Sequence, residues 1–268
     1  MKRVQLFEFE DFQWFPSFLR TSMTNLIVVI NKMMGVSDVL AKFISDISKD
    51  HPVTHIVDLG SGAGGAMPEV QQKLAIDYQV NTHLTLTDLY PNADALKKFN
   101  HEGNTNLTYN TSSVDATKLD QTPKGLKTMI NCFHHMRPEQ AKAILTSAKE
   151  SKEPILIYEL TENKMPLLLW WLLLPLSLTI LIIMSLFMTP FVKPLTWKQI
   201  VFTYFIPIIP IFYAWDGQAS MPRLYSFDDL DELLKGLDDP GYTWSKGYAY
   251  DKDGKKSGTY LMGLPELN

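Results

Sequence analysis

The segment that most constrains the fold of this chain is residues 55–65, HIVDLGSGAGG. Its first half is apolar and β-branched, which is typical of a buried parallel strand, and its second half is rich in glycine. Glycine lets the backbone turn sharply and approach a ligand without a Cβ in the way. We therefore predict a strand, a ligand-binding turn, and then a helix that begins near Met67.

The glycine spacing alone fits two classes of ligand. Gly60, Gly62 and Gly65 satisfy the G-x-G-x-x-G pattern of dinucleotide-binding turns. Asp58, two positions before the first glycine, would repel a pyrophosphate but suits the sulfonium and ammonium groups of S-adenosylmethionine. The motif formed by Asp58, Gly60, Gly62 and Gly64 resembles the first motif of class I S-adenosylmethionine-dependent methyltransferases. The resemblance implies that cofactor and methyl transfer. A nicotinamide-dependent reductase and a non-catalytic S-adenosylmethionine-binding protein are the alternatives.

Strands and helices alternate along the rest of the chain. Further parallel strands are predicted at residues 83–88, 107–110, 126–133 and 154–159, with a helix from Pro138 to about Ser147. Residues 242–250 and 258–263 are predicted to form an antiparallel pair. The expected fold is α/β, a Rossmann-like doubly wound seven-stranded sheet with a C-terminal antiparallel strand pair.

Two acidic positions extend the predicted cofactor site. Asp88 ends the second strand, where a carboxylate can accept both ribose hydroxyls of S-adenosylmethionine or of NAD; a helix N-cap or turn acid is the plainer interpretation. Asp115 and Ala116 follow the third strand and resemble the acidic-small pair that contacts adenine in this superfamily. An aspartate after a strand is also common in ordinary loops.

The acceptor side is expected at the ends of the fourth and fifth strands. His134 and His135 occupy the loop after the fourth strand, and either imidazole is a candidate general base; a histidine that only packs or caps is the alternative. Glu159 ends the fifth strand and completes the predicted catalytic set. Asp216 and Arg223 are further acceptor-side candidates, or else a turn before a helix capped at Ser226.

No metal site is expected, because two adjacent histidines in a loop should point apart and Cys132 is the only cysteine. The single cysteine also excludes a disulfide within the chain. The net charge of −4 and the lack of a basic patch with interleaved aromatics argue against a nucleic-acid partner. The first residues turn acidic and aromatic and do not resemble a secretory signal, so we expect a cytoplasmic enzyme.

An apolar insertion follows the fifth strand. Residues 167–188 carry no charge and are long enough to cross a bilayer, whereas residues 200–215 are shorter and contain Pro207 and Pro210. The chain must return to complete the sheet, so it crosses zero times or twice. Two crossings would place Lys193 and Lys198 on the far side, against the usual bias of basic residues.

We therefore expect a helical hairpin that lies in one leaflet on the cytoplasmic side of the membrane. The predicted interface anchors are the aromatic residues Trp170, Trp171, Tyr204, Tyr213 and Trp215. An apolar cap or homodimer interface is the alternative. Because the insertion leaves the sheet beside Glu159, the expected acceptor is a lipid or lipophilic small molecule.

Residues 7–16 with Arg20 and Thr24, and residues 215–226, are similar to uncharacterised bacterial methyltransferase-domain proteins that carry the same insertion. The similarity implies membrane association, although Met221 and Pro222 depart from its pattern. The predicted domains are an N-terminal helical lid (1–50), a cofactor-binding domain (51–164 and 216–268) and a membrane-associating insertion (165–215).

Overall fold

The computed structural model describes residues 1–101 and 106–266. Its strands form one seven-stranded sheet in the order β3-β2-β1-β4-β5-β7-β6. The first five strands are parallel, and β7 pairs antiparallel with both β5 and β6. The strands are β1 (His55–Leu59), β2 (His83–Thr87), β3 (Leu107–Tyr109), β4 (Leu126–Ile130), β5 (Ile155–Glu159), β6 (Tyr242–Tyr250) and β7 (Lys256–Pro265). This confirms the predicted fold class.

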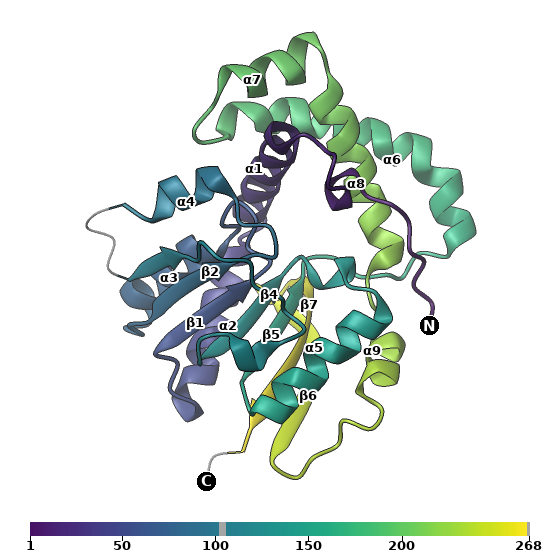
Figure 1. Ribbon diagram of the computed structural model, residues 1–268. Coiled ribbons are helices and arrows are strands. Elements are labelled where there is room, and N and C mark those ends of the chain that lie inside the picture. The colour runs from purple at the N-terminus through teal and green to yellow at the C-terminus, as the bar shows by residue number, and fades with distance from the viewer. Residues whose placement is uncertain (102–105, 267–268) are drawn as a thin grey trace.

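Helices cover both faces of the sheet (Figure 1). Side chains of α2 (Val36–Asp50), α3 (Met67–Asp77) and α4 (Ala93–Phe99) share one buried apolar cluster with the sheet. Those of α5 (Pro138–Ser151) and α9 (Phe227–Leu234) share a second cluster. Strands buried on both faces explain why β1 and β5 read as apolar runs rather than as alternating patterns.

Helix boundaries follow local signals. Pro138 occupies the first turn of α5, where a missing N–H costs nothing, but the helix continues to Ser151 rather than ending near Ser147. The predicted cap at Ser226 is present, because its Oγ accepts a hydrogen bond from Asp229 N at the start of α9. The fourth strand ends at Ile130, earlier than predicted, and a 3₁₀ turn (Phe133–His135) follows it.

The apolar insertion forms a helical layer at one end of the molecule. It contains α6 (Leu167–Met188), a short α7 (Trp197–Ile200), a π-helical turn (Val201–Phe205) and the first half of α8 (Ile208–Arg223). This layer packs on α1 (Ser17–Met33) through a third apolar cluster, and α7 stands at the top of Figure 1. Helices α6 and α8 pack on each other, and the connection between them contains the short α7 and the π-helical turn.

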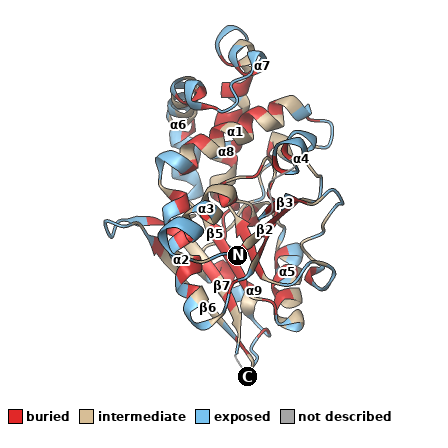
Figure 2. Ribbon diagram, turned by 90° about the vertical axis from the view of Figure 1, so that its left-hand side faces the viewer, coloured by how far each residue is buried: buried red, intermediate tan, exposed pale blue. Residues whose placement is uncertain are grey.

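Helix α8 joins this layer to the body of the protein. It runs without a break across residues 215 and 216, where the domain boundary was predicted. The alternative interpretation of Asp216–Gly217 as a turn is wrong, because both residues lie inside α8. Asp216 is buried there, and Figure 2 shows mixed buried and exposed positions along the helix.

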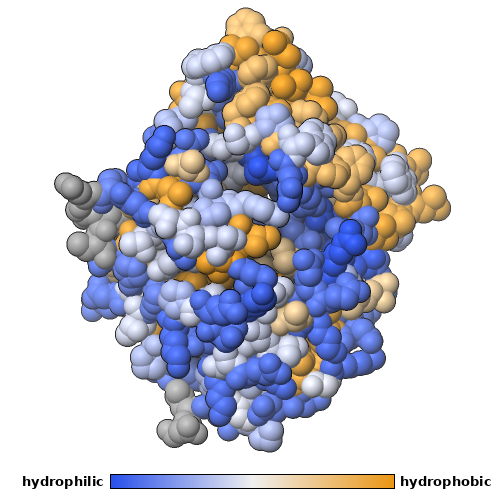
Figure 3. Space-filling model, viewed as in Figure 1, coloured by the Kyte–Doolittle hydropathy of each residue, from blue (hydrophilic) through white to orange (hydrophobic). Residues whose placement is uncertain are grey.

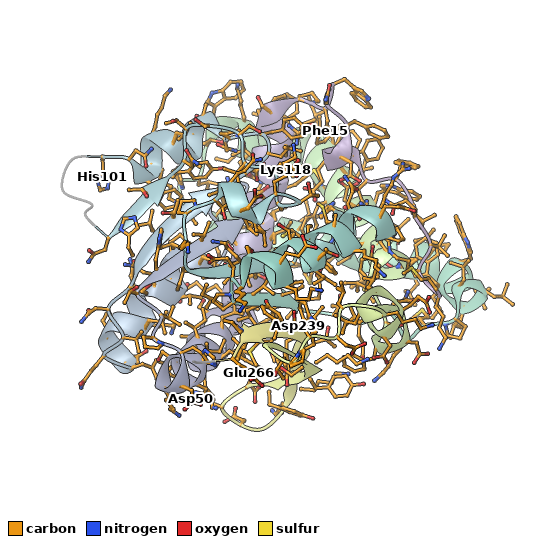
Figure 4. The ribbon with its side chains drawn as sticks, turned by 60° about the horizontal axis from the view of Figure 1, so that its bottom comes forward. Phe15, Asp50, His101, Lys118, Asp239 and Glu266 are labelled. Atoms are coloured by element: carbon orange, nitrogen blue, oxygen red, sulfur yellow. The ribbon has the colours of Figure 1, made fainter. Side chains whose placement is uncertain are left out.

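The carboxyl ends of β1, β4 and β5 point toward the helical layer, so the residues after these strands meet beneath it. Figure 4 shows Phe15, from the N-terminal segment, on the opposite side of the view from Asp50 and Glu266, which end α2 and follow β7. Ligands bind at the carboxyl edge in open α/β sheets, which directs the search for a site to the end nearer Phe15.

Candidate functional site

The glycine turn after β1 has a backbone that side chains would obstruct. Gly60, Gly62 and Gly64 have φ values of +70°, +53° and +107°, in the region that favours glycine. A Cβ on Gly64 would lie 2.6 Å from Cε2 of Phe99. Ser61 N donates to Thr87 O over 2.9 Å, which ties the turn to the end of β2. The turn is thus fixed by backbone contacts that a larger residue would disrupt.

Asp88 lies against this turn from the neighbouring strand. Its Oδ2 accepts a hydrogen bond from Gly62 N over 2.8 Å, and its Oδ1 accepts from Tyr90 N. Burial raises the pKa of Asp88, although the two N–H donors oppose the shift. The carboxylate predicted to hold ribose therefore sits beside the predicted cofactor turn, as the spacing requires.

Asp58 lies behind the turn, with 3% of its surface exposed. Its two carboxylate oxygens accept hydrogen bonds from Ser61 Oγ and Thr128 Oγ1, both over 2.6 Å. Burial raises the pKa of Asp58 to about 7, against the opposing effect of the two hydroxyl donors. A positively charged ligand in the turn would favour its ionised form. Because Asp58 is buried, its carboxylate would influence a bound ligand through its charge and by holding Ser61 of the turn, rather than by direct contact.

Asp115 and Ala116 follow β3 on the surface next to β2. Asp115 is exposed and accepts hydrogen bonds from the amide and the hydroxyl of Thr117. Ala116 packs against the cluster that includes α5. Val114 N donates to the backbone carbonyl of Asp88, so this loop is tied to the residue that was predicted to hold ribose. An adenine contact here stays a prediction.

His134 and Glu159 form a pair at the ends of β4 and β5. His134 Nδ1 lies 2.9 Å from Glu159 Oε2, and His134 N donates to Glu159 Oε1 over 3.0 Å. Two contacts from one carboxylate fix the ring orientation and favour the tautomer with the proton on Nδ1. The lone pair of Nε2 is then available to a proton or a cation. Glu159 is accordingly a positioning residue for His134.

His135 lies in a cluster of acids from the N-terminal segment. Its Nδ1 is 2.9 Å from Asp11 Oδ1 and 3.3 Å from Glu8 Oε2. Burial would lower the pKa of His135, but the charges of Glu8, Asp11 and Glu10 outweigh it and raise the pKa to about 10. A protonated imidazole cannot accept a proton, so the general-base role predicted for either histidine fits His134 and not His135.

Asp216 and Arg223, on one buried stretch of α8, hold the same N-terminal segment in place. The Asp216 carboxylate accepts from the amides of Phe9 and Glu10 over 2.8 and 3.1 Å. Arg223 is fully buried, and its Nη1 lies 2.9 Å from Glu8 Oε1 and 2.7 Å from Asp11 Oδ2. Both residues contact the N-terminal segment, and a role on the acceptor side stays a prediction.

The two histidines do not point apart. Their ring centroids are 4.4 Å apart with an interplanar angle of 32°, so the rings lie side by side. The argument used above against a metal, that adjacent histidines in a loop must diverge, is therefore wrong for this loop. The 3₁₀ conformation of Phe133–His135 brings the two side chains together.

The sequence predicted no functional role for several residues of the site. These are the three acids of the N-terminal segment (Glu8, Glu10, Asp11), the two hydroxyls on Asp58 (Ser61, Thr128) and Asn131 at the end of β4. The acids stand in an aromatic segment more than 120 residues from His135, and only the resemblance of residues 7–16 drew attention to them. Their role depends on tertiary contacts.

No family model and no curated protein sequence matches this chain. Among solved structures it is similar to a plantazolicin methyltransferase, BpumL, in complex with SAH (TM-score 0.52, 10% identity), over 93% of this chain and 98% of that one. An O-methyltransferase family protein from Burkholderia thailandensis has a TM-score of 0.48 and 12% identity over 88% of this chain. This chain spans 58% of the length of that protein. The chain has a methyltransferase-like α/β fold.

Proposed function

We propose that this protein is an S-adenosylmethionine-dependent methyltransferase that works at a membrane surface on a lipid or lipophilic small molecule. One observation carries the proposal. The glycine turn with Asp88 and the His134–Glu159 pair lie at the same edge of the sheet. The chain enters the apolar layer a few residues after Glu159. This arrangement suits a donor held beside an acceptor that comes from an apolar phase.

The cofactor proposal rests on the turn and on the sheet. Asp58 places a carboxylate behind the glycines, where a pyrophosphate would be disfavoured and a sulfonium favoured. Antiparallel β7, inserted between β5 and β6, is the C-terminal arrangement expected from the methyltransferase resemblance. The similar BpumL structure contains SAH, the product of methyl donation. These observations favour S-adenosylmethionine over a nicotinamide cofactor.

Methyl transfer from a sulfonium is an in-line displacement, so alignment of donor and acceptor supplies much of the rate. When the acceptor is a hydroxyl, its proton must also leave. The Nε2 lone pair of His134, oriented by Glu159, is the group at this edge best arranged to receive that proton.

The membrane proposal rests on an exposed apolar surface. Leu167–Phe191 is long and apolar enough to cross a membrane, and 11% of its most apolar window is buried. In Figure 3 apolar residues gather over the top and upper right of the molecule, where α7 and α6 lie, while the body below is mostly hydrophilic. An apolar patch of this extent on a soluble monomer is unusual and indicates an interaction surface.

The geometry of α8 favours a layer within one leaflet. The 16-residue helix is about 24 Å long, shorter than a hydrocarbon core of about 30 Å. Its second half is buried around Asp216 and Arg223. It also bends by 83° from the α7 segment before it. Placement on the cytoplasmic face stays a prediction.

Two of the five predicted interface anchors are wrong. Trp170 and Tyr213 are 3% and 7% exposed, so they pack inside the protein. Trp171 and Tyr204 are 49% and 46% exposed and remain candidate anchors, whereas Trp215 is half-buried and donates to Phe7 O.

A pocket of about 580 Å³ at the base of the apolar layer suits part of a lipophilic acceptor. Its walls include Trp170, Met221 and Tyr225, with Lys2 and Lys164 among its polar residues. Arg3 connects it to the site, since its guanidinium packs over the Tyr225 ring at 4.5 Å and donates to His134 O.

The proposal is tested by incubating the full-length protein in vesicles with methyl-labelled S-adenosylmethionine and a total bacterial lipid extract. We expect the label to enter the lipid fraction in proportion to protein and time, and heat-treated protein to give none. Label transferred only to water-soluble compounds would reject the lipophilic acceptor and keep methyl transfer. Absence of transfer to both fractions would reject the enzyme.

A further inference from the structure

The N-terminal segment and the loop after β4 bring Glu8, His134 and His135 together. One ligand atom from each lies within 4.8 Å of the others. Glu8 and His134 are buried and His135 is half-buried. We propose that these three side chains bind a first-row divalent metal ion, with Zn²⁺ the best match to the donor set.

A buried and unsatisfied oxygen points to a ligand at this position. Glu8 is fully buried, and within residues 1–101 and 106–266 its Oε2 has no hydrogen-bond partner, only an ion-pair contact with His135 Nδ1. A buried carboxylate oxygen without a hydrogen bond is costly, and native structures rarely keep one without a bound ion or water. Glu8 Oε2 lies 3.3 Å from His135 Nδ1, close to the roughly 3.3 Å between donors on a tetrahedral zinc.

The outer contacts are those that metal ligands usually have. Metal-binding histidines commonly donate their other ring N–H to a carboxylate, and metal-binding carboxylates accept further hydrogen bonds. His134 has Glu159 on Nδ1, which leaves Nε2 for a metal. Glu8 has Arg223 Nη1 and Ser220 Oγ on its Oε1, which leaves Oε2.

The local charge also favours a cation. Carboxylates of Glu10, Asp11 and Glu159 lie against the two histidines, in addition to that of Glu8. The guanidinium of Arg223 offsets one of these charges.

The donor set selects the kind of ion. Two imidazoles and one carboxylate suit Zn²⁺, whereas Mg²⁺ and Ca²⁺ prefer oxygen ligands throughout. Three protein ligands leave the fourth tetrahedral position open for an outside oxygen or nitrogen, as in catalytic zinc sites. While an ion occupies Nε2 of His134, that lone pair cannot also receive the acceptor proton, so in the metal-bound protein the proton would have to pass to a group on the ion instead. Binding of the ion is tested below without methyl transfer.

The test is calorimetric titration of ZnCl₂ into the full-length, EDTA-treated and dialysed protein in detergent. We expect one saturable site, and affinity at least about 100-fold weaker in each of Glu8→Gln, His134→Asn and His135→Asn. His83→Asn is the matched control, because His83 lies 5.2 Å from the His55 ring at the other edge of the sheet and should leave the affinity unchanged.

A second measurement on the wild-type protein tests the site even if a variant fails to fold. Co²⁺ added to the wild-type protein should give the visible absorption bands of a tetrahedral ion, and one equivalent of Zn²⁺ should remove them. Absence of saturable Zn²⁺ binding by the wild-type protein would overturn the proposal. Equal affinity in the Glu8 and His134 variants would overturn it as well, since the ion would then be bound elsewhere.

Discussion

Replacing His134 by asparagine is expected to lower the turnover of methyl transfer by about 10²- to 10⁴-fold. The substitution removes the Nε2 lone pair at the ends of β4 and β5 but keeps a polar side chain of similar size. The cofactor turn is built by other residues, so the affinity for S-adenosylmethionine should stay within a few-fold of the wild-type value. Single-turnover kinetics with labelled cofactor, together with cofactor titration, measure the two quantities separately.

His83→Asn is the matched control for this prediction, because it changes a histidine at the amino end of β2, away from the site. Glu159→Gln should also lower turnover, since the amide cannot hold the His134 ring through two acceptor oxygens. If His134→Asn keeps turnover within threefold of wild type, the acceptor needs neither a base nor a metal at this position. An amine that is already deprotonated would behave in that way.

The double substitution Leu172→Glu and Phe187→Glu is expected to weaken vesicle binding by about 10²- to 10⁴-fold. These side chains are 74% and 73% exposed on α6, and burying each in an apolar phase contributes about 1.5–3 kcal/mol. Their contacts inside the protein are few, so the thermal unfolding temperature should change little. Co-sedimentation with liposomes measures the binding, and circular dichroism measures unfolding.

The control changes two exposed apolar residues outside the insertion. Ile76→Glu and Tyr250→Glu, at positions 78% and 52% exposed, should leave vesicle binding unchanged. One outcome would assign the apolar surface of α6 to a different partner. If the Leu172 and Phe187 variant turns a dimer into a monomer while vesicle binding persists, the apolar surface is an interface between two copies of the chain.

The sheet was predictable because its signals are local. The run 55–65 contains both the buried strand and the glycines whose positive φ values the turn needs. Asp88 follows its strand at the distance that a nucleoside site requires, and the structure places it on Gly62. Such patterns depend on a few neighbouring residues, and tertiary contacts do not override them here.

The acceptor side was less predictable because its contacts join distant parts of the chain. Glu8 and Arg223 are 215 positions apart in numbering, yet their side chains form a buried ion pair. Asp216 looked like a turn residue beside a glycine, but packing of α8 on α1 and α6 carries the helix through it. Tertiary packing can override a local turn signal. The orientation of the histidine pair likewise depends on the 3₁₀ turn.

Titration of the purified protein with S-adenosylmethionine, SAH and NAD in parallel tests the central claim most directly. The account predicts saturable binding of S-adenosylmethionine and SAH, with NAD at least about 100-fold weaker, because Asp58 disfavours a pyrophosphate at the turn. Asp88→Ala should weaken both favoured ligands by about 1.5–3 kcal/mol, the contribution of a hydrogen bond to a charged group. NAD binding as tight as that of S-adenosylmethionine would contradict the account.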